Sequence, residues 1–268
     1  FSAVVYGLLI IGIAVIFKSV GPPVTGFTWQ QRFESLPGAL PIVAVILIII
    51  CFVYNPFGED AWGTPTEGGA IGAFIVFCMA MWRKMRLNEF KDALIETAKL
   101  TVMIFTIIWG VLIFVRFLGF ADLPGAFSDW ITSLNASPLL ILVCILLAYA
   151  VLGMFMDAIG MLLLTLPVVY PAVMALNGGE DVSAAESAFG MSGEMCAIWF
   201  GILVVKMAEF CLITPPIGLN CFVVAGVRDD LSVQDVFKGV TPFFIADAIT
   251  IAGLVAFPQI VLWLPSQV

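Results

Sequence analysis

Residues 213–218 of the chain are Ile-Thr-Pro-Pro-Ile-Gly, and they interrupt a long apolar segment over residues 190–227. Two consecutive prolines remove two backbone N–H donors and clash with the preceding turn, so an α-helix cannot continue through them. The residue before a proline is also pushed out of the helical region, which places the helix end near Thr214. The segment is therefore predicted to cross in two helical halves, joined by an unwound stretch that ends at Gly218. A simple proline kink without a ligand is the alternative.

The chain around this motif has the composition of a membrane protein. Of its 268 residues, 62% are hydrophobic and only 11% are charged, with a mean hydropathy of +1.13, whereas a soluble domain carries about 25% charged residues. Several apolar runs reach the roughly 20 residues that a helix needs to cross about 30 Å of hydrocarbon. These runs are continuous rather than alternating, which favours helices over a β-barrel. The predicted fold class is an all-α membrane protein.

Apolar runs elsewhere in the chain predict the remaining elements. The stretch over residues 122–136 is amphipathic and contains Trp130, so we expect it to lie at the membrane interface. The first apolar run starts abruptly, without a methionine or a charged leader, so we expect the chain to be part of a longer protein. The predicted spanning helices are Phe1–Phe17, Pro37–Tyr54, Thr64–Trp82, Leu100–Leu118 and Val240–Leu264.

Positive charge indicates the orientation of these spans. The connection Arg83–Lys99 carries five of the eleven basic residues, and basic connections stay on the cytoplasmic side. Counting outward from it, the acidic loops at residues 59–60 and 180–181 fall outside. This count holds only if residues 138–176 enter and leave the membrane on the same face. The connections predicted to lie inside are residues 18–36, 83–99 and 228–239.

The segment Pro138–Leu176 is apolar except at residues 153–157, Gly-Met-Phe-Met-Asp. A carboxylate in the middle of an apolar stretch is costly and suggests a function, and Gly153 lets the backbone turn or approach a neighbour closely. The residues before it are too few for a full span, so we predict a re-entrant helical hairpin that folds back inside the bilayer. An ordinary loop between two conventional spans, with Asp157 at the water interface, is the alternative.

A broken helix together with a re-entrant hairpin is typical of secondary transporters, which bind their solute near the membrane midplane. Unwound backbone frees carbonyl oxygens that bind Na⁺, and a helix N-terminus attracts an anionic substrate group. We expect Na⁺ to be held mainly by backbone carbonyls near Gly153 and Thr214. Asp157 would either ligate the ion or cap the second hairpin helix, and the cap is slightly favoured. The predicted sodium and substrate region comprises Gly153, Met154, Asp157, Thr214, Pro215, Pro216, Gly218 and Asn220.

Two further polar groups are predicted to be structural. Residues 64–67, Thr-Pro-Thr-Glu, have the pattern of a helix start, with Thr64 as the N-cap and Glu67 as its capping-box partner. Lys206 and Glu209 are three positions apart on one helix face, where an ion pair lowers the cost of carrying charge into lipid. Structural pairing is favoured over a proton relay for these two residues.

Other classes of function are disfavoured by the composition. The chain has no histidine, the commonest metal ligand and the usual general base. No nucleophile is paired with a base, so an intramembrane enzyme is disfavoured, and we expect no cofactor beyond Na⁺ as the coupling ion. The net charge of −8 without a basic stripe argues against nucleic acid as a partner. The six cysteines are isolated, without metal-binding spacing, and are expected to act as small hydrophobic residues.

Four strings of the sequence occur in a familiar order and spacing. They are Thr64-Pro-Thr-Glu-Gly-Gly-Ala-Ile-Gly72, Gly153-Met-Phe-Met-Asp-Ala158, Thr165-Leu-Pro-Val-Val-Tyr-Pro171 and Val205-Lys-Met-Ala-Glu-Phe-Cys-Leu-Ile-Thr-Pro-Pro-Ile-Gly-Leu-Asn220. Together they resemble the large membrane (M) subunit of tripartite ATP-independent periplasmic (TRAP) transporters, over nearly the whole chain. Two departures concern packing: Gly68-Gly69 stands where the family often has alanines, and Cys211 stands where it commonly has glycine.

The resemblance implies an inverted-repeat, elevator-type transporter, of which this chain holds the second repeat and the end of the first. It implies that residues 138–176 are the second re-entrant hairpin, and that residues 214–218 are the unwound point facing its tip. Three regions follow. They are residues 1–137 (the end of the first repeat with the scaffold and arm helices), 138–227 (the transport hairpin and the broken helix) and 228–268 (a cytoplasmic loop and the final span).

The same resemblance implies the function and the partners. The family couples Na⁺ entry to the uptake of small organic acids, which a periplasmic substrate-binding protein delivers. It works with a small membrane subunit in the lipid bilayer of the bacterial or archaeal cytoplasmic (inner) membrane. A stand-alone Na⁺/anion symporter of the same architecture, which needs no binding protein, and a non-transporting membrane scaffold subunit are the alternatives.

Overall fold

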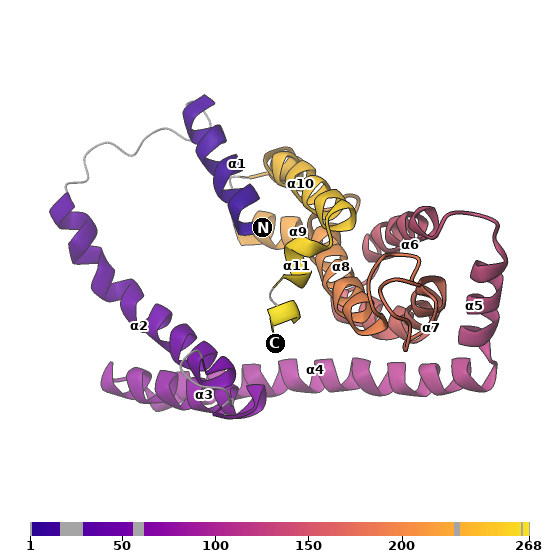
Figure 1. Ribbon diagram of the computed structural model, residues 1–268. Helices are drawn as coiled ribbons and strands as arrows, with labels where there is room; N and C mark the ends of the chain where they lie inside the picture. The colour runs from indigo at the N-terminus through magenta and orange to yellow at the C-terminus, as the bar shows by residue number, and fades with distance from the viewer. Residues whose placement is uncertain (1, 17–28, 56–61, 228–230, 264, 268) are drawn as a thin grey trace. The chain divides into compact units, whose positions relative to one another are not determined.

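The computed structural model describes residues 2–16, 29–55, 62–227, 231–263 and 265–267, and every regular element within them is helical (Figure 1). The chain forms two compact units, one of residues 22–102 and one of residues 1–21 with 103–268. Five of the described helices are long and apolar enough to cross a membrane, as expected of a multi-pass all-α membrane protein. These five are α3 (Pro65–Trp82), α4 (Leu87–Phe120), α7 (Ala158–Asn177), α8 (Gly193–Ile213) and α10 (Val233–Ala256).

The smaller unit contains α2 (Trp29–Tyr54), which packs against α3. The start of α3 confirms the predicted capping box. Thr64 Oγ1 accepts from the Glu67 N–H at 3.3 Å, and the Glu67 carboxylate accepts from the Thr64 N–H at 2.8 Å. Two backbone donors that a helix start leaves without partners are thereby satisfied by side chains.

Glycines set the distance between α2 and α3. A Cβ added at Gly68 would meet Val53 Cγ2 at 2.9 Å, and one added at Gly72 would overlap the Ile49 side chain. Gly69 has open space around the position of its missing Cβ. The close packing that the glycine pair suggested is therefore present at Gly68 and absent at Gly69.

The structure corrects the predicted boundary between a basic connection and the fourth span. The sequence predicts a connection over residues 83–99 and a span from Leu100, but α4 is one continuous helix of 34 residues that begins at Leu87. Residues 87–109 contain neither proline nor glycine, so nothing in them ends a helix. The first turns of α4 are rich in charged residues and therefore have the composition of a loop, although they belong to the same continuous helix as the span.

Two other helices begin earlier than predicted. α2 begins at Trp29 and α10 begins at Val233, each inside a predicted connection. At α10 the cause is a missed N-cap, because the Ser232 hydroxyl accepts from the Asp235 N–H at 3.2 Å. The predicted acidic loop at residues 59–60 lies outside the described residues.

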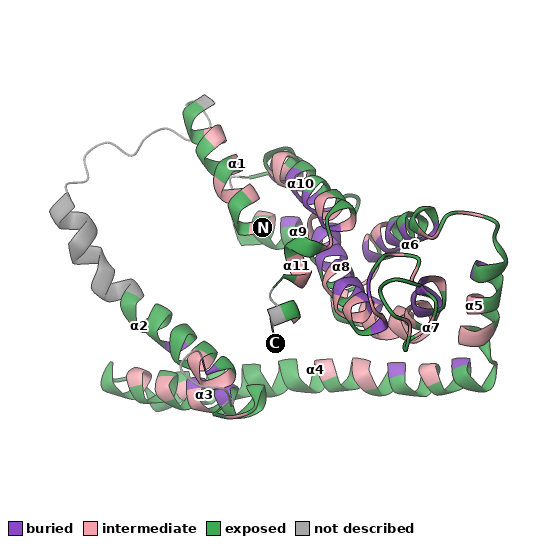
Figure 2. Cartoon of the chain, in the orientation of Figure 1, coloured by how far each residue is buried: buried purple, intermediate pink, exposed green. Residues whose placement is uncertain are grey.

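The larger unit is built around α8. The most extensive contacts on it are made by α6 (Pro138–Gly153), α7 and α10, while α1 (Ser2–Ile16) packs on α10 and α5 (Leu123–Ser133) on α7. Figure 2 shows buried residues concentrated along α8 and a mostly exposed α4. A helix that is apolar all round is stable when neighbours or lipid surround it, and α8 has neighbours on several sides. The described part of α1 has 15 residues.

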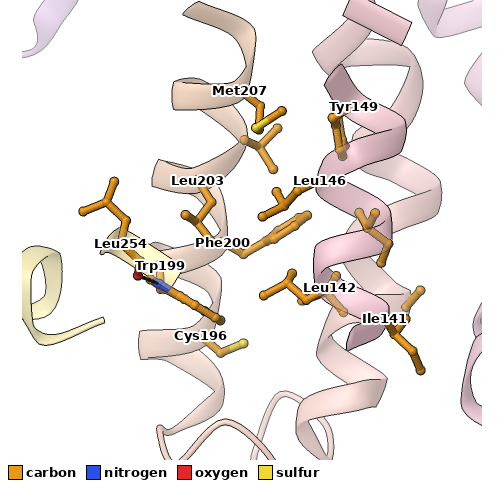
Figure 3. Packing of buried hydrophobic residues seen from close by; sticks show 14 of the residues in the cluster. Ile141, Leu142, Leu146, Tyr149, Cys196, Trp199, Phe200, Leu203, Met207 and Leu254 are labelled. Carbon is orange, nitrogen blue, oxygen red and sulfur yellow. Dashed lines mark hydrogen bonds between the residues drawn. The ribbon is translucent and has the colours of Figure 1, made fainter. Parts of the chain in front are cut away.

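The main core lies between α8 and α6 (Figure 3). Phe200 and Leu203 of α8 and Leu142 of α6 have no exposed surface. Four of the buried residues of α8 recur at three- and four-residue spacing, which places them along the face toward α6. Lipid tails are as apolar as these side chains, so close packing rather than exclusion from water holds the helices together. The labelled residues of this face of α8 are Cys196, Phe200, Leu203 and Met207.

α10 ends earlier than predicted, at Ala256, because a proline follows at residue 258. Pro258 has no N–H to offer the Leu254 carbonyl, and the buried Trp199 indole donates to that carbonyl at 2.9 Å instead. A separate short helix, α11 (Gln259–Leu262), follows. The C-terminal end of α10 is thus attached to α8 by a hydrogen bond that replaces a helical one.

Candidate functional site

The predicted hairpin is formed by α6 and α7, which pack together and are joined by residues 154–157. Asp157 is extended and caps α7, because its carboxylate accepts from the Ile159 N–H at 3.1 Å. α7 has 20 residues and is long enough to cross a membrane, whereas α6 has 16. The path of the hairpin through the membrane therefore stays a prediction, because a full crossing by α7 is also compatible with its length.

Gly153 permits a close approach between the hairpin and α8. A Cβ added at Gly153 would overlap Cys211 Sγ and would lie 3.0 Å from Met161 Sδ. Cys211 is buried, and its thiol lies 3.5 Å from the Tyr149 carbonyl oxygen. The cysteine that departs from the family pattern therefore does not separate the two helices, because the space it needs is provided by the glycine on α6.

The broken helix has the predicted interruption. α8 ends at Ile213, and α9 (Leu219–Val227) follows. Thr214 has φ −85° and ψ 129°, and its buried hydroxyl donates to the Phe210 carbonyl at 2.6 Å. Gly218 ends the break with φ +47°, in the left-handed region where glycine carries no steric penalty. The two parts are unequal rather than halves, because α8 has 21 residues and α9 has 9.

Four helix ends meet around one cavity of about 80 Å³. Gly153 ends α6 and Asp157 caps α7, and both residues line the cavity together with Met154. Leu212 in the last turn of α8 and Leu219 at the start of α9 line it as well. The hairpin turn and the helix break, which are far apart in the sequence, therefore share one cavity.

The helix ends around this cavity carry opposite partial charges. The C-terminal ends of α6 and α8 present carbonyl oxygens, whereas the N-terminal ends of α7 and α9 present N–H groups. In a continuous helix the Leu212 carbonyl would accept a hydrogen bond from the N–H of residue 216, but residue 216 is a proline and has none. The carbonyl of Leu212, a residue that lines the cavity, therefore lacks this helical hydrogen bond. One small space thus lies between helix ends of both signs, an arrangement that can attract either a cation or an anion.

The size of the cavity favours an ion. One water takes about 30 Å³ of liquid volume, so the cavity of about 80 Å³ has room for a small cation with one or two waters. Pockets for organic ligands usually have about 300–1,000 Å³. A larger hollow of about 690 Å³ lies near the opposite end of α8, between the loop before it and α11, but no charged side chain lines it. An organic substrate would need space beyond the small cavity.

Four of the predicted site residues do not line the cavity. Thr214 is buried, and its hydroxyl donates to the Phe210 carbonyl of α8. Pro215, Pro216 and Asn220 are exposed. The Pro215–Pro216 peptide bond is cis. Leu212 lines the cavity without having been predicted, because its freed carbonyl depends on the proline four residues later. The sequence does contain this signal, because the residue four positions after Leu212 is Pro216, which has no N–H to donate.

A pair of hydroxyl groups connects the two hairpin helices. The Thr165 hydroxyl lies 2.8 Å from the Tyr149 hydroxyl and 2.7 Å from the Met161 carbonyl oxygen. Thr165 has one proton, so when it donates to the carbonyl, Tyr149 must donate to Thr165. Tyr149 is buried, so this contact holds α6 against α7 inside the core rather than at the surface.

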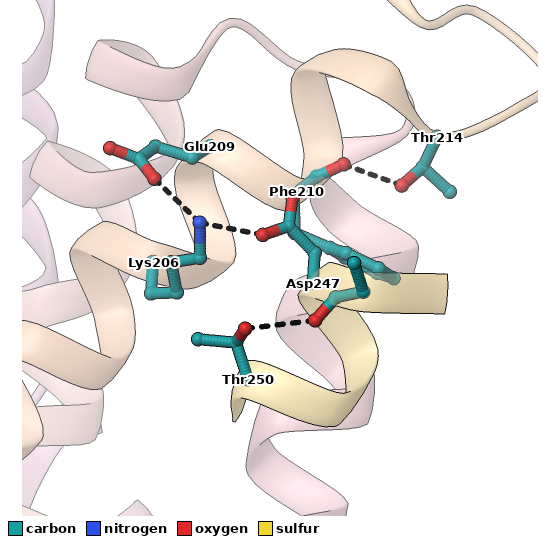
Figure 4. Close-up of polar contacts among 7 residues, drawn as sticks. Lys206, Glu209, Phe210, Thr214, Asp247 and Thr250 are labelled. Carbon is teal, nitrogen blue, oxygen red and sulfur yellow. Dashed lines mark hydrogen bonds and ion pairs between the residues drawn. The ribbon is translucent and has the colours of Figure 1, made fainter. Parts of the chain in front are cut away.

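A buried ion pair joins α8 to α10 (Figure 4). Lys206 Nζ lies 2.6 Å from Asp247 Oδ1 and 2.9 Å from Glu209 Oε2. The side chains of Lys206 and Asp247 are 7% and 2% exposed, whereas that of Glu209 is 62% exposed. The predicted pairing of Lys206 with Glu209 is present, but sequence analysis missed the buried partner. The signal for Asp247 was the same as for Asp157, a carboxylate inside an apolar run.

Comparisons with known proteins agree on one family. The family model described as "Tripartite ATP-independent periplasmic transporter, DctM component" matches residues 2–260. The chain belongs to this DctM family. As a DctM-family protein it is a part of a transporter subunit and not an enzyme, since the relatives are transporter permease proteins.

Several curated relatives of the DctM family have named solutes. The C4-dicarboxylate TRAP transporter large permease protein DctM of Pseudomonas aeruginosa is 30% identical over 225 residues, which cover 82% of this chain and 48% of that protein. The sialic acid TRAP transporter large permease protein SiaM of Vibrio cholerae is 26% identical, covering 88% of this chain and 50% of that protein. The 2,3-diketo-L-gulonate TRAP transporter large permease protein YiaN of Escherichia coli is 29% identical, covering 74% and 43%. The chain thus spans about half the length of these relatives.

Proposed function

We propose that the chain forms the ion-coupling part of the large permease of a Na⁺-driven importer of small organic acids. The observation that carries this proposal is the cavity where the ends of α6, α7, α8 and α9 meet. Discontinuous helices around a shared site are the usual build of ion-coupled secondary transporters. The solutes named for the relatives are C4-dicarboxylates, sialic acid and 2,3-diketo-L-gulonate, and all three are organic acids, which supports the substrate class.

In this mechanism Na⁺ enters the cavity and is held by carbonyl oxygens at the ends of α6 and α8. Gly153 and Leu212 are the lining residues nearest those two ends. The ion offsets the repulsion between the partial negative charges of two helix C-termini, so its binding favours the closed approach of the hairpin to the break. The first N–H groups of α9, at Leu219 and Asn220, have no helical acceptor and remain available for a substrate carboxylate.

We further propose that the hairpin is re-entrant and that it moves with the broken helix as one body, in an elevator mechanism. Both hairpin helices pack on α8, so the two sides of the cavity cannot separate without losing the Gly153–Cys211 approach. The partners would be a small membrane subunit and a periplasmic substrate-binding protein, in the bacterial or archaeal cytoplasmic membrane. The words "tripartite" and "periplasmic" in the family description support this assignment.

Uptake into liposomes tests the proposal. The full-length permease and its small subunit are reconstituted, and a radiolabelled C4-dicarboxylate, sialic acid or 2,3-diketo-L-gulonate is added with the binding protein. We expect uptake of at least one acid under an inward Na⁺ gradient and none under an equal K⁺ gradient. Uptake that does not depend on the binding protein would favour the stand-alone symporter. Absence of Na⁺-driven uptake for every acid would favour the scaffold.

A matched pair of variants connects the uptake to the break. Thr214 and Thr250 are both buried, and each hydroxyl donates to a carbonyl four residues earlier, at 2.6 Å and 2.8 Å. Only Thr214 lies in the break, so Thr214→Ala should lower the initial rate of Na⁺-driven uptake about tenfold, as the loss of a group that orients ion ligands does. Thr250→Ala should leave it nearly unchanged. Equal rates for the two variants would place the ion site elsewhere.

A further inference from the structure

α10 runs antiparallel to the broken helix and contacts both of its parts. Its C-terminal half follows α8, through a hydrogen bond, an ion pair and a stacked pair of rings whose centroids are 4.6 Å apart. Its N-terminal end packs on α9. α10 therefore spans the interruption that divides α8 from α9. The contacts on α8, from the C-terminal end of α10 toward its N-terminus, are Leu254 with Trp199, Asp247 with Lys206 and Phe244 with Phe210.

Phe237 of α10 lies at the interruption itself. Gly218 is buried, and a Cβ at this position would meet Phe237 Cε1 at 2.7 Å and Cζ at 3.0 Å. The same ring makes an edge contact with Phe222 of α9, with centroids 6.2 Å apart and an interplanar angle of 84°. Phe237 therefore fills the corner between the break and α9, while the rest of its helix is anchored on α8.

Pro242 separates these two groups of contacts along α10. It lies inside the helix, and it removes the N–H that would bond to the Lys238 carbonyl, which is a common cause of a local bend. The Thr241 hydroxyl donates to the Phe237 carbonyl at 2.9 Å, one turn earlier. The segment that carries Phe237 can therefore follow the break and α9 while the segment after Pro242 stays with α8.

We infer that Phe237 is a positioning residue for the cation site, and that it acts by holding Gly218. Ile217, Gly218 and Leu219 line the small cavity, whereas no residue of α10 does. Glycine has the most freedom of all residues in φ and ψ, so the ring that rests on Gly218 restricts the backbone that faces the ion. The inference rests on the proposed Na⁺ site and adds to it the element that fixes its geometry.

Binding of ²²Na⁺ to the purified full-length permease in detergent tests this role without requiring the identity of the substrate. Choline replaces Na⁺ to keep the ionic strength constant, and unlabelled Na⁺ competes. Phe237→Ala should raise the half-saturating Na⁺ concentration about tenfold, as expected when a group that orients a ligand is lost, with the number of sites unchanged. Phe237→Leu keeps an apolar group on Gly218 and should recover most of the affinity.

Phe244→Ala is the matched control. Phe244 is a half-buried phenylalanine on the same helix and stacks on Phe210 of α8, so its loss lowers stability in a similar way but leaves Gly218 covered. The half-saturating Na⁺ concentration of Phe244→Ala should stay close to that of the wild type. This should hold even if the melting temperature of Phe244→Ala falls as far as that of Phe237→Ala. Equal shifts in affinity for the two variants, or no shift for Phe237→Ala, would overturn the inference alone. A wild-type protein that does not bind ²²Na⁺ would overturn the proposed function as well.

A double-mutant comparison tests the contact itself. Gly218→Ala adds the Cβ that meets Phe237, and its left-handed φ strains alanine whatever the neighbour. If the ring acts through Gly218, then Gly218→Ala should weaken Na⁺ binding by a smaller factor in the Phe237→Ala protein than in the wild type. Factors that simply multiply would show that the two residues act independently and would contradict the inference.

Discussion

At the scale of single residues, Gly153 shows how a missing side chain can shape the candidate site. We expect Gly153→Ala to lower the free energy of unfolding by about 1–3 kcal/mol, because the overlap of the new Cβ with Cys211 must be relieved by a shift of α6 or α8. Thermal unfolding of the purified permease measures this effect. The variant should also weaken Na⁺ binding, since the same shift widens the cavity that Gly153 lines.

Two further variants make the Gly153 prediction specific. An added Cβ at Gly160 of α7 has open space, so Gly160→Ala should be neutral or stabilise the helix by about 0.5–1 kcal/mol. Adding Cys211→Gly to Gly153→Ala empties the overlapping position and should recover part of the lost stability. If Gly160→Ala were as destabilising as Gly153→Ala, the close approach would not be the cause.

Asp157 lines the cavity and also caps α7, and its charge and its capping oxygen can be separated. Asparagine keeps an oxygen that can accept from the Ile159 N–H, whereas alanine does not. We expect Asp157→Ala to cost about 1 kcal/mol of stability and to weaken ²²Na⁺ binding, with Asp157→Asn close to the wild type in both measurements. Weak Na⁺ binding by a stable Asp157→Asn protein would instead make the carboxylate a direct ligand.

The ion pair between Lys206 and Asp247 predicts that removing the Asp247 carboxylate costs much more stability than removing the Glu209 carboxylate. Asp247→Ala leaves a buried ammonium group without its buried partner and should cost about 3 kcal/mol or more. Glu209 is largely exposed, so Glu209→Ala should cost less than about 1 kcal/mol. Chemical unfolding in mixed micelles compares the two. Lys206→Met combined with Asp247→Leu removes both buried charges and should recover most of the loss, whereas similar costs for the two single variants would contradict this assignment.

At the scale of elements, the end of α10 is held by a substitute for a helical hydrogen bond. Trp199→Phe keeps the ring in the core but leaves the Leu254 carbonyl without the indole N–H, because Pro258 offers none. We expect a cost of about 1–3 kcal/mol, the range for a buried polar group that loses its partner, measured by thermal unfolding. Trp109→Phe on the exposed surface of α4 is the control and should have almost no effect.

Signals confined to a few neighbouring residues were enough to predict several elements. The proline pair located the break, Asp157 located the start of α7, and Thr64 with Glu67 located the start of α3. The start of α4 could not be found in this way, because its charged first turns have the composition of a loop and only the absence of helix breakers shows that they continue into the span. Local signals therefore locate a helix end that a proline or a capping residue marks better than one at which the composition resembles a loop.

The candidate site was predictable in its parts rather than in its assembly. The sequence pointed to the hairpin turn and to the break, but the residues that line the cavity depend on which helix ends meet in space. Leu212 and Asp247 were missed for this reason: one acts through a proline four residues on, and the other through a lysine on a different helix. Phe237 has no sequence signal at all, since its role depends on the glycine it covers.

At the scale of the whole molecule, the orientation in the membrane yields the last prediction. The basic residues before α4 place its start in the cytoplasm, and α4 crosses outward. A hairpin that returns to the face it entered then leaves the loop after α7 outside. We expect a cysteine at Ala185 to react with a bulky, membrane-impermeant maleimide in intact cells, and one at Asn88 to react only after the membrane is opened. Both positions are exposed.

A third cysteine distinguishes a re-entrant hairpin from two full crossings. Phe155 lies in the hairpin turn and is exposed, so a turn inside the bilayer should keep Phe155→Cys from the bulky maleimide on either side, while a small permeant thiol reagent still reaches it. A hairpin that crosses completely would instead place Phe155→Cys at the cytoplasmic surface, where the maleimide labels it in opened membranes. If α7 alone crosses, the cysteine at Ala185 becomes cytoplasmic and the predicted orientation fails. All three cysteine variants are made in a protein whose native cysteines that are not buried have been replaced by alanine. These are Cys51, Cys78 and Cys144.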